Sequence, residues 1–307
     1  MVKHMEEYIG KVKLNYEFYK GTDEYSDGDI EDSMLEIVKS CKDEYELEER
    51  LMHENEWTYL YHFSKIRQNV LDWYDFDKDK TILEIGAGCG AISGLFCRKT
   101  KQVTAVDLSK RRSMINAYRN KEYDNLEILV GNFEDIIFRE KYDYVSLIGV
   151  LEYSIYYINS DDPFTDMLKK VKSLLKPGGK LLLAIENKYG LKYWSGATED
   201  HTGKLFDGIQ GYKDVDRVRT FSKDGLKKLL ESAGFEENDF YYPVPDYKLP
   251  LEIYSEGYLP KKGDIKSVSP AYDRDRYEVF DEVLVYNSLC EDGMFEQFAN
   301  SFIVVSC

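Results

Sequence analysis

The sequence predicts an α/β fold built on a doubly wound, mostly parallel sheet of seven strands. The chain has 307 residues with 43% hydrophobic and 32% charged residues, which is the composition of a packed globular protein. From residue 81 onward, short apolar runs alternate with segments of helical periodicity. Strands buried on both faces of a parallel sheet have this continuous apolar character.

Each expected strand is one of these apolar runs. They cover residues 81–85, 103–106, 126–130, 144–148, 181–185, 240–242 and 302–305. Helices are expected between them, at 92–99, 110–120, 166–175 and 222–232. Ser222 is a suitable N-cap for the last of these helices, and Gly234 follows its end. Ligands of such sheets bind at the carboxyl ends of the strands.

The chain is expected to divide into an N-terminal helical cap and a main domain. Residues 1–75 place apolar side chains such as Met34, Leu35 and Val38 at helical spacing. Residues 76–307 hold the sheet, with excursions at 188–220 and 246–299 that are longer than ordinary connections. Long excursions of this kind are commonly lids or binding loops, so we expect them to shape a substrate pocket.

Charge and cysteine content restrict the partners and the compartment. The formal net charge of −16 disfavours a nucleic-acid substrate, because such binding depends on Lys and Arg neutralising phosphates. The five cysteines have no paired spacing, and no apolar run approaches the length of a membrane span. We therefore expect a cytoplasmic protein without a membrane segment. No group of His, Cys and acidic residues has metal-site spacing, so no metal is expected.

A glycine-rich turn directly follows the first expected strand. Residues 82–85 run into Gly86-Ala87-Gly88-Cys89-Gly90, where the backbone can turn sharply and approach a ligand. Asp107 ends the next strand, roughly 20 residues after the first glycine, which is the position of an acid that binds ribose hydroxyls. The pattern also satisfies a dinucleotide fingerprint, so an NAD(P)-dependent oxidoreductase is an alternative at this point.

Further residues resemble those of class I S-adenosylmethionine-dependent methyltransferases. Glu84 lies two positions before the first glycine, where these enzymes carry an acid. Matching segments follow the third, fourth and fifth strands at 131–135, 147–152 and 175–180. The resemblance implies a Rossmann-like fold and S-adenosylmethionine as the cofactor.

The resemblance also implies a role for each matched residue. Gly86, Ala87 and Gly88 would approach the methionine part of the cofactor. Asp107 would hold the ribose, and Leu108 would pack beside the adenine.

Four other residues complete the expected cofactor site. Asn132 and Phe133 would meet the edge of the adenine, although the family often has aspartate where Asn132 stands. Gly149 would line the floor beneath the sulfonium. Arg67 could reach the cofactor carboxylate as a bidentate donor, or it could form a surface salt bridge instead.

A looser likeness extends over most of the chain. It links the protein to a bacterial subgroup of these methyltransferases associated with cell-surface polysaccharide assembly. The segments that carry it are residues 60–64, 185–187, 190–193, 199–203, 206–208 and 245–250.

Three candidates for a catalytic base lie in loops that follow expected strands. They are Glu152 after the fourth strand, Glu186 after the fifth, and His201 with its acidic neighbour Asp200 in the next excursion. His201 is the first choice because an imidazole titrates near neutral pH. Alternatively, His201 only anchors its loop through a hydrogen bond, and Glu152 lines the site without acting as the base.

The sequence thus predicts methyl transfer from S-adenosylmethionine to oxygen or nitrogen of a small-molecule or glycan acceptor. Two alternatives stay open: the oxidoreductase above, and a noncatalytic cofactor-binding partner of a glycosyltransferase.

Overall fold

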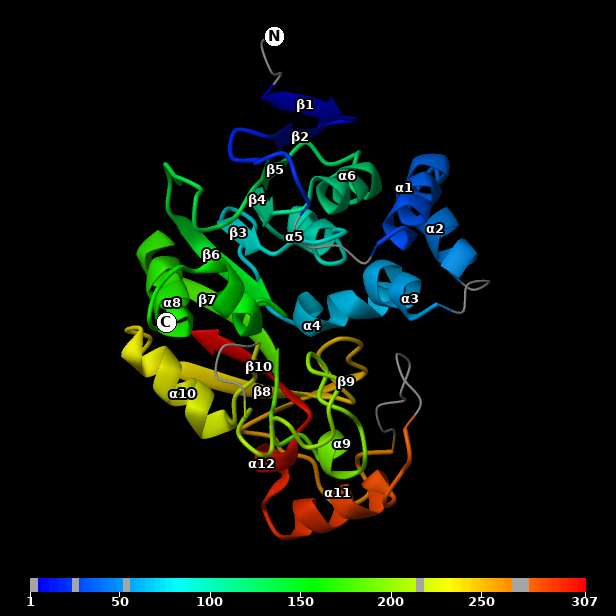
Figure 1. Cartoon of the computed structure of the whole chain (residues 1–307), viewed down its shortest axis with the longest axis vertical. Coiled ribbons are helices and arrows are strands. Elements are labelled where there is room, and N and C mark those ends of the chain that lie inside the picture. Colours follow the sequence, from blue (N-terminus) through cyan, green and yellow to red (C-terminus); the bar gives the residue numbers. More distant parts are fainter. Residues whose placement is uncertain (1–4, 24–27, 52–55, 214–217, 267–275) are drawn as a thin grey trace. The chain divides into compact units, whose positions relative to one another are not determined.

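The computed structural model describes residues 5–23, 28–51, 56–213, 218–266 and 276–307. The chain divides into two compact units (Figure 1). The first comprises residues Met1–Ser146 and Leu174–Gly179, and the second comprises Leu147–Ser173 and Lys180–Cys307.

The first unit is built on parallel strands joined by helices. Its strands lie in the order β1-β2-β5-β4-β3-β6. Their bounds are β1 (Glu6–Ile9), β2 (Val12–Asn15), β3 (Thr81–Ile85), β4 (Gln102–Asp107), β5 (Leu126–Val130) and β6 (Tyr142–Ile148), of which the last two residues belong to the second unit. Strands β2, β5, β4 and β3 pair in parallel, whereas β1 pairs with β2 in antiparallel fashion. This is the doubly wound order expected for the fold class.

Several helices of the first unit share an apolar cluster that includes Met34, Leu47, Phe63 and Ile115. They are α1 (Ile30–Ser40), α2 (Glu44–Leu51), α3 (Trp57–Phe63), the 3-10 helix η1 (Lys65–Gln68), α4 (Asn69–Asp72), α5 (Ser93–Lys99) and α6 (Lys110–Arg119). The Ser109 hydroxyl caps α6 by accepting the Arg112 N–H. Helix α1 lies against α6 (Figure 1), where Arg112 Nε donates to Glu31 Oε1 over 2.7 Å and both side chains are buried.

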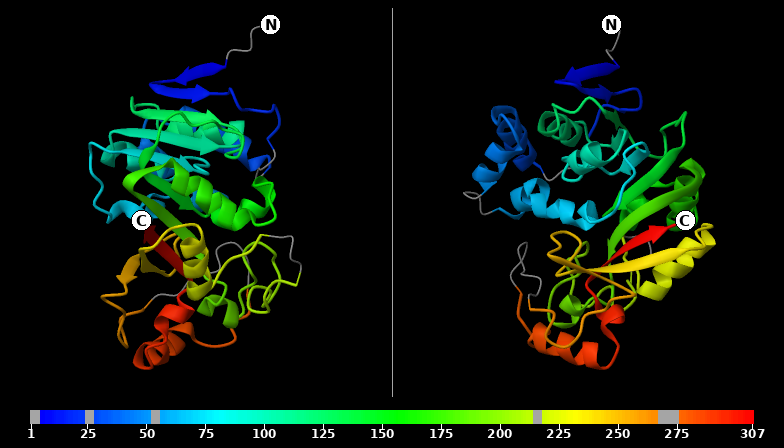
Figure 2. Two further views of the ribbon diagram at one scale, coloured as in Figure 1. Left: turned by 90° about the vertical axis from the view of Figure 1, so that its left-hand side faces the viewer. Right: turned by 180° about the vertical axis from the view of Figure 1, so that it is seen from behind.

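A helical cap was predicted for residues 1–75, but this range contains two strands as well as helices. The hairpin of β1 and β2 lies at the edge of the strand series (Figure 2). Val12 and Leu14 are fully buried while Lys13 is partly exposed, which is the alternation of a strand. The helices occupy Ile30 to Asp72, and part of the predicted cap, at 1–4, 24–27 and 52–55, lies outside the described residues.

The second unit is built on antiparallel strands in the order β7-β10-β8-β9. Their bounds are β7 (Leu175–Glu186), whose first residues belong to the first unit, β8 (Asn238–Val244), β9 (Glu252–Ser255) and β10 (Ser301–Ser306). Its helices are η2 (Leu151–Tyr153), α7 (Ser154–Tyr157), α8 (Pro163–Leu174), α9 (Leu191–Trp194), α10 (Lys223–Ser232), α11 (Glu282–Glu291) and α12 (Phe295–Phe298). The Ser222 hydroxyl accepts the Gly225 N–H and caps α10, as expected.

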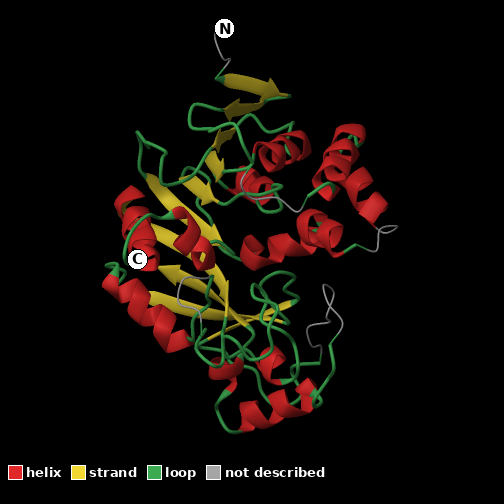
Figure 3. Ribbon diagram, in the orientation of Figure 1, coloured by secondary structure: helices red, strands yellow, loops and turns green. Residues whose placement is uncertain are grey.

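All seven expected strands are present, but the described residues hold ten (Figure 3). The additional strands are β1, β2 and β9, each of four residues. Such short strands carry too few residues for their alternation to stand out in the sequence. Parts of both predicted excursions, at 214–217 and 267–275, lie outside the described residues. Among the helices that the structure does describe, none has the length and apolar character needed to cross a bilayer.

Candidate active site

The glycine turn of the first unit ties the end of β3 to the end of β4. The N–H groups of Gly86 and Ala87 donate to the Val106 carbonyl oxygen over 2.8 and 3.0 Å. The Gly88 N–H donates to Asp107 Oδ2 over 2.8 Å. Gly86 and Gly88 have φ of 71° and 52°, in the left-handed region that favours glycine. The predicted cofactor turn is thus a closed loop at the carboxyl end of the parallel strands.

Asp107 is held by backbone donors on both of its carboxylate oxygens. Oδ1 accepts the Ser109 N–H over 2.9 Å, and Oδ2 accepts the Gly88 N–H. Burial raises the pKa of Asp107 above its usual range, against the opposing effects of Arg112 and these two N–H groups. The carboxylate therefore has a fixed direction at the point where a ribose is expected.

Glu84 lies beneath the turn and is buried. Its Oε2 accepts the Ser93 hydroxyl over 2.6 Å, which links β3 to the start of α5. Burial, together with the charge of Asp107, raises the pKa of Glu84 to about 8, although Ser93 and Arg67 act in the opposite direction. Arg67 is itself buried, with its guanidinium 4.1 Å from the centre of the Tyr61 ring.

Leu108, Asn132 and Phe133 lie in the loops that follow β4 and β5. Leu108 follows Asp107 directly and is partly buried. The loop after β5 is attached to β4 because the Gly131 N–H donates to the Asp107 carbonyl oxygen over 2.9 Å. Phe133 is buried, and Asn132 Oδ1 accepts the N–H two residues ahead. The structure therefore brings the predicted residues after β3, β4 and β5 into adjoining loops.

Gly149, in the second unit, lies against a tyrosine hydroxyl. Its N–H donates to the Ala184 carbonyl oxygen over 2.9 Å, and its φ is 69°. A Cβ at this position would lie 2.8 Å from the Tyr247 hydroxyl. Both the backbone conformation and the available space thus favour glycine here.

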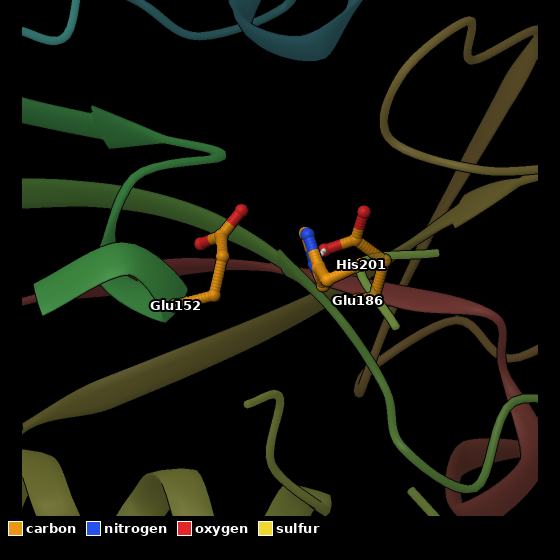
Figure 4. A group of neighbouring side chains, drawn as sticks. All are labelled: Glu152, Glu186 and His201. Atoms are coloured by element: carbon orange, nitrogen blue, oxygen red, sulfur yellow. Dashed lines mark ion pairs between the residues drawn. The ribbon is translucent and has the colours of Figure 1, made fainter. Parts of the chain in front are cut away.

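The three predicted base candidates lie together in the second unit (Figure 4). Glu152 comes from η2, Glu186 from the end of β7, and His201 from the loop after α9. One polar atom from each side chain lies within 4.8 Å of the other two. His201 Nε2 is 3.7 Å from Glu186 Oε2. These two atoms and Glu152 Oε2 are buried and have no hydrogen-bond partner among the described residues.

The opposite atoms of two of these side chains are anchored. His201 Nδ1 is 3.1 Å from the Tyr153 hydroxyl. Glu186 Oε1 is 2.7 Å from Lys248 Nζ and accepts the Tyr247 hydroxyl over 3.3 Å. Each side chain thus has one fixed polar atom and one that faces the shared space.

The three groups shift each other's pKa. Burial, with the charge of Glu186, raises the pKa of Glu152 to about 8. Burial would lower the pKa of His201, but its interaction with Glu186, 3.7 Å away, outweighs this effect and raises the pKa to about 9. Burial likewise opposes ionisation of Glu186, yet Lys248 and His201 hold its pKa below the usual range. The neutral imidazole that a base requires therefore becomes abundant only as the pH approaches 9.

A family model described as a methyltransferase domain matches residues 57–238, more than half of the chain. The chain belongs to this methyltransferase family. The family assignment confirms the expected enzyme class and its cofactor, S-adenosylmethionine.

Known relatives of this methyltransferase differ in what they act on. Ribosomal RNA small subunit methyltransferase A of Mycoplasma capricolum is 25% identical over 57% of this chain and 59% of its own length. Malonyl-[acyl-carrier protein] O-methyltransferase of Priestia megaterium is 31% identical over 38% of this chain and 40% of its own length. The chain thus spans about half the length of these curated relatives. Phosphoethanolamine N-methyltransferase 1 of Haemonchus contortus, solved with S-adenosylhomocysteine, has a TM-score of 0.48 at 14% identity, covering 91% of this chain and 48% of that one.

Asp200, the acidic neighbour of His201 in the sequence of this methyltransferase, is bound by other residues. Asp200 is adjacent in sequence, but its carboxylate binds Lys192 over 2.8 Å and Lys248 over 3.1 Å. It also accepts the Tyr193 hydroxyl. Neighbouring residues of a loop commonly point in different directions, and the acid that faces the imidazole is Glu186.

Sequence reasoning missed the residues that support the three candidates. They are Tyr153, Tyr247 and Lys248. Two of them, Tyr247 and Lys248, lie in the segment 245–250 that carries part of the resemblance to the bacterial subgroup. The signal was therefore present, but nothing in the sequence connected this segment with Glu186.

Proposed function

We propose that the protein transfers the methyl group of S-adenosylmethionine to oxygen or nitrogen of a small-molecule or glycan acceptor. The loops of Gly86, Asp107 and Asn132 would bind the cofactor. Glu152, Glu186 and His201 would contact the reacting group of the acceptor.

One observation supports the proposed role of Glu152, Glu186 and His201 at the acceptor. Glu152, Glu186 and His201 each direct a buried polar atom without a hydrogen-bond partner into the same space. Leaving such an atom unsatisfied costs about 1 to 3 kcal/mol, so proteins rarely retain several together without a functional reason. A hydroxyl or amine of an acceptor would satisfy them.

The charge of the protein supports a small-molecule or glycan acceptor over a nucleic acid. A net charge of −16 repels a polyphosphate backbone. Because one relative acts on ribosomal RNA, that RNA belongs among the acceptors to be tested. The segments 185–187 and 245–250, which supply Glu186 and Lys248, support an acceptor from the bacterial cell-surface polysaccharide pathway.

The proposal is tested by incubating the purified protein with methyl-labelled cofactor and separate pools of cell-envelope glycan precursors, amines and ribosomal RNA. Label in a glycan or small-molecule fraction is expected. The Glu152→Gln variant should lose most of this transfer while still binding S-adenosylhomocysteine. Label found only in RNA, or full transfer by Glu152→Gln, would contradict the proposal.

A further inference from the structure

The space between Glu152, Glu186 and His201 has the donor set of a cation site. Two carboxylate oxygens and one imidazole nitrogen face it, and all three atoms are buried without hydrogen-bond partners among the described residues. Carboxylate and imidazole together are ligands of first-row divalent metal ions. Donors bound at about 2 Å from one ion lie up to about 4 Å apart, so the observed spacing within 4.8 Å needs only a small closure.

The outer contacts orient these donors toward the same space. The Tyr153 hydroxyl holds His201 Nδ1, which leaves Nε2 directed inward. Lys248 and the Tyr247 hydroxyl hold Glu186 Oε1, which leaves Oε2 without a hydrogen-bond partner among the described residues. A carboxylate oxygen of Glu186 faces His201 (Figure 4). Metal-binding histidines and carboxylates characteristically have such second contacts, which fix the ligand and its tautomer.

The charges around the space also favour a cation. Two lysines, Lys192 and Lys248, are linked to three acids, Glu186, Asp200 and Asp246. Glu152 is a fourth acid, and none of the ion pairs found in the described residues includes it. With all four carboxylates ionised, the two lysines and a protonated His201, which lies 3.7 Å from Glu186, still leave one negative charge without compensation. Buried charges are normally paired or bound to a metal ion.

We propose that Glu152, Glu186 and His201 bind one divalent transition-metal ion of the manganese or zinc type. The expected absence of a metal rested on the lack of a local motif. The three ligands are 34 and 15 residues apart along the chain, so no local spacing could display them.

This inference rests on the proposed function for the role of the ion. A bound ion would coordinate the hydroxyl oxygen of the acceptor and lower its pKa. The proton passes to solvent, and a lone pair of the oxygen forms the new bond to the methyl carbon. The electron pair of the broken carbon–sulfur bond stays on the sulfur of S-adenosylhomocysteine. His201 is then a ligand rather than the base.

Binding is tested directly on the full chain after treatment with a chelator. Titration with Mn²⁺, followed by the paramagnetic resonance signal of the free ion, should show one saturable site per chain. Glu152→Gln should weaken the affinity for Mn²⁺ by at least about tenfold. Tyr153→Phe removes only the orienting hydroxyl and should weaken this affinity by about tenfold. Co²⁺ should give a visible absorption spectrum characteristic of a site with a nitrogen ligand. The His201→Ala variant should lose this spectrum.

The matched control is Glu291→Gln, which replaces an exposed acid of α11 that pairs with Lys262. This variant should bind Mn²⁺ as the wild type does. Thermal unfolding with and without Mn²⁺ checks folding, because only proteins with the site should be stabilised by the ion. Absence of a saturable site, or equal affinity in the wild type and Glu152→Gln, would overturn the inference.

A methyl-transfer assay separates this inference from the proposed function. If a protein that binds no ion continues methyl transfer undiminished in chelator, the metal site is refuted. The proposed function is then unaffected. An ion bound as described, without methylation of any acceptor, refutes the proposed function and leaves the metal site standing.

Discussion

Glu186 Oε1 lies 2.7 Å from Lys248 Nζ, and the Glu186 side chain is completely buried. Lys248 also reaches Asp200 over 3.1 Å, so one ammonium group fixes two carboxylates from different segments. A carboxylate in the interior requires such a partner because the loss of hydration is otherwise uncompensated. The pair therefore sets the direction in which the other oxygen of Glu186 points.

Replacement of Lys248 by methionine should destabilise the protein strongly. The variant leaves Glu186 and Asp200 without their shared cation, and breaking a buried pair in this way costs about 3 to 5 kcal/mol. The free energy of unfolding in denaturant measures the loss. Lys262→Met, which breaks an exposed pair with Glu291, should cost less than about 1 kcal/mol. Equal losses in the two variants would show that burial of the pair is unimportant.

Gly149→Ala should be destabilising for two separable reasons. The new Cβ would lie 2.8 Å from the Tyr247 hydroxyl, and the backbone φ is 69°. Tyr247→Phe in the same chain should relieve the first effect and retain the second, about 1 kcal/mol of backbone strain. Gly234→Ala is the control for strain alone, because its φ is 92° and its Cβ would meet nothing within 4 Å. If both glycine variants unfold at the same temperature, the contact with Tyr247 has no effect.

Asp107→Ala should weaken binding of S-adenosylhomocysteine at least about tenfold. Each hydrogen bond to a charged acceptor contributes about 1.5 to 3 kcal/mol, and the Asp107 carboxylate also orients the Gly88 N–H. Isothermal titration calorimetry measures the affinity. Asp166→Ala, which removes an exposed acid of α8 paired with Lys169, should bind as the wild type does. Unchanged affinity in Asp107→Ala would remove this residue from the cofactor site.

Protonation of Asp143 should lower the stability of the folded protein as the pH falls below about 4. Burial opposes ionisation of Asp143, but Lys176 at 2.7 Å and the Thr81 N–H outweigh it and lower its pKa to about 2. A depressed pKa stabilises the folded chain above the unfolded value and loses this effect as the pH falls towards 2. Asp143→Asn should thus be up to about 2 kcal/mol less stable than the wild type near neutral pH. The difference should shrink on acidification. Equal pH dependence of both proteins would contradict the assignment.

The parallel part of the fold could be predicted because its signals are local. The run at 81–85 coincides with β3, which is buried from Ile82 to Ile85, and the run at 126–130 coincides with β5. Ser222 and Gly234 marked the ends of α10 through their capping chemistry. The hairpin of β1 and β2 could not be predicted, because its strands are short and β1 is largely exposed.

The candidate site could be predicted only residue by residue. Glu152, Glu186 and His201 were each selected because they follow a strand in a loop. Their meeting depends on the tertiary fold, and so does the anchoring of Glu186 by Lys248, which is 62 residues away in the chain. Asp200 is the neighbour of His201 in the sequence, whereas its carboxylate binds Lys192 in the structure.

The most direct test of the account is calorimetric titration of the purified chain with S-adenosylhomocysteine and, separately, with NAD⁺ and NADP⁺. Saturable binding of one S-adenosylhomocysteine per chain is expected, with no binding of either dinucleotide. Binding of a nicotinamide dinucleotide without any response to S-adenosylhomocysteine would contradict it.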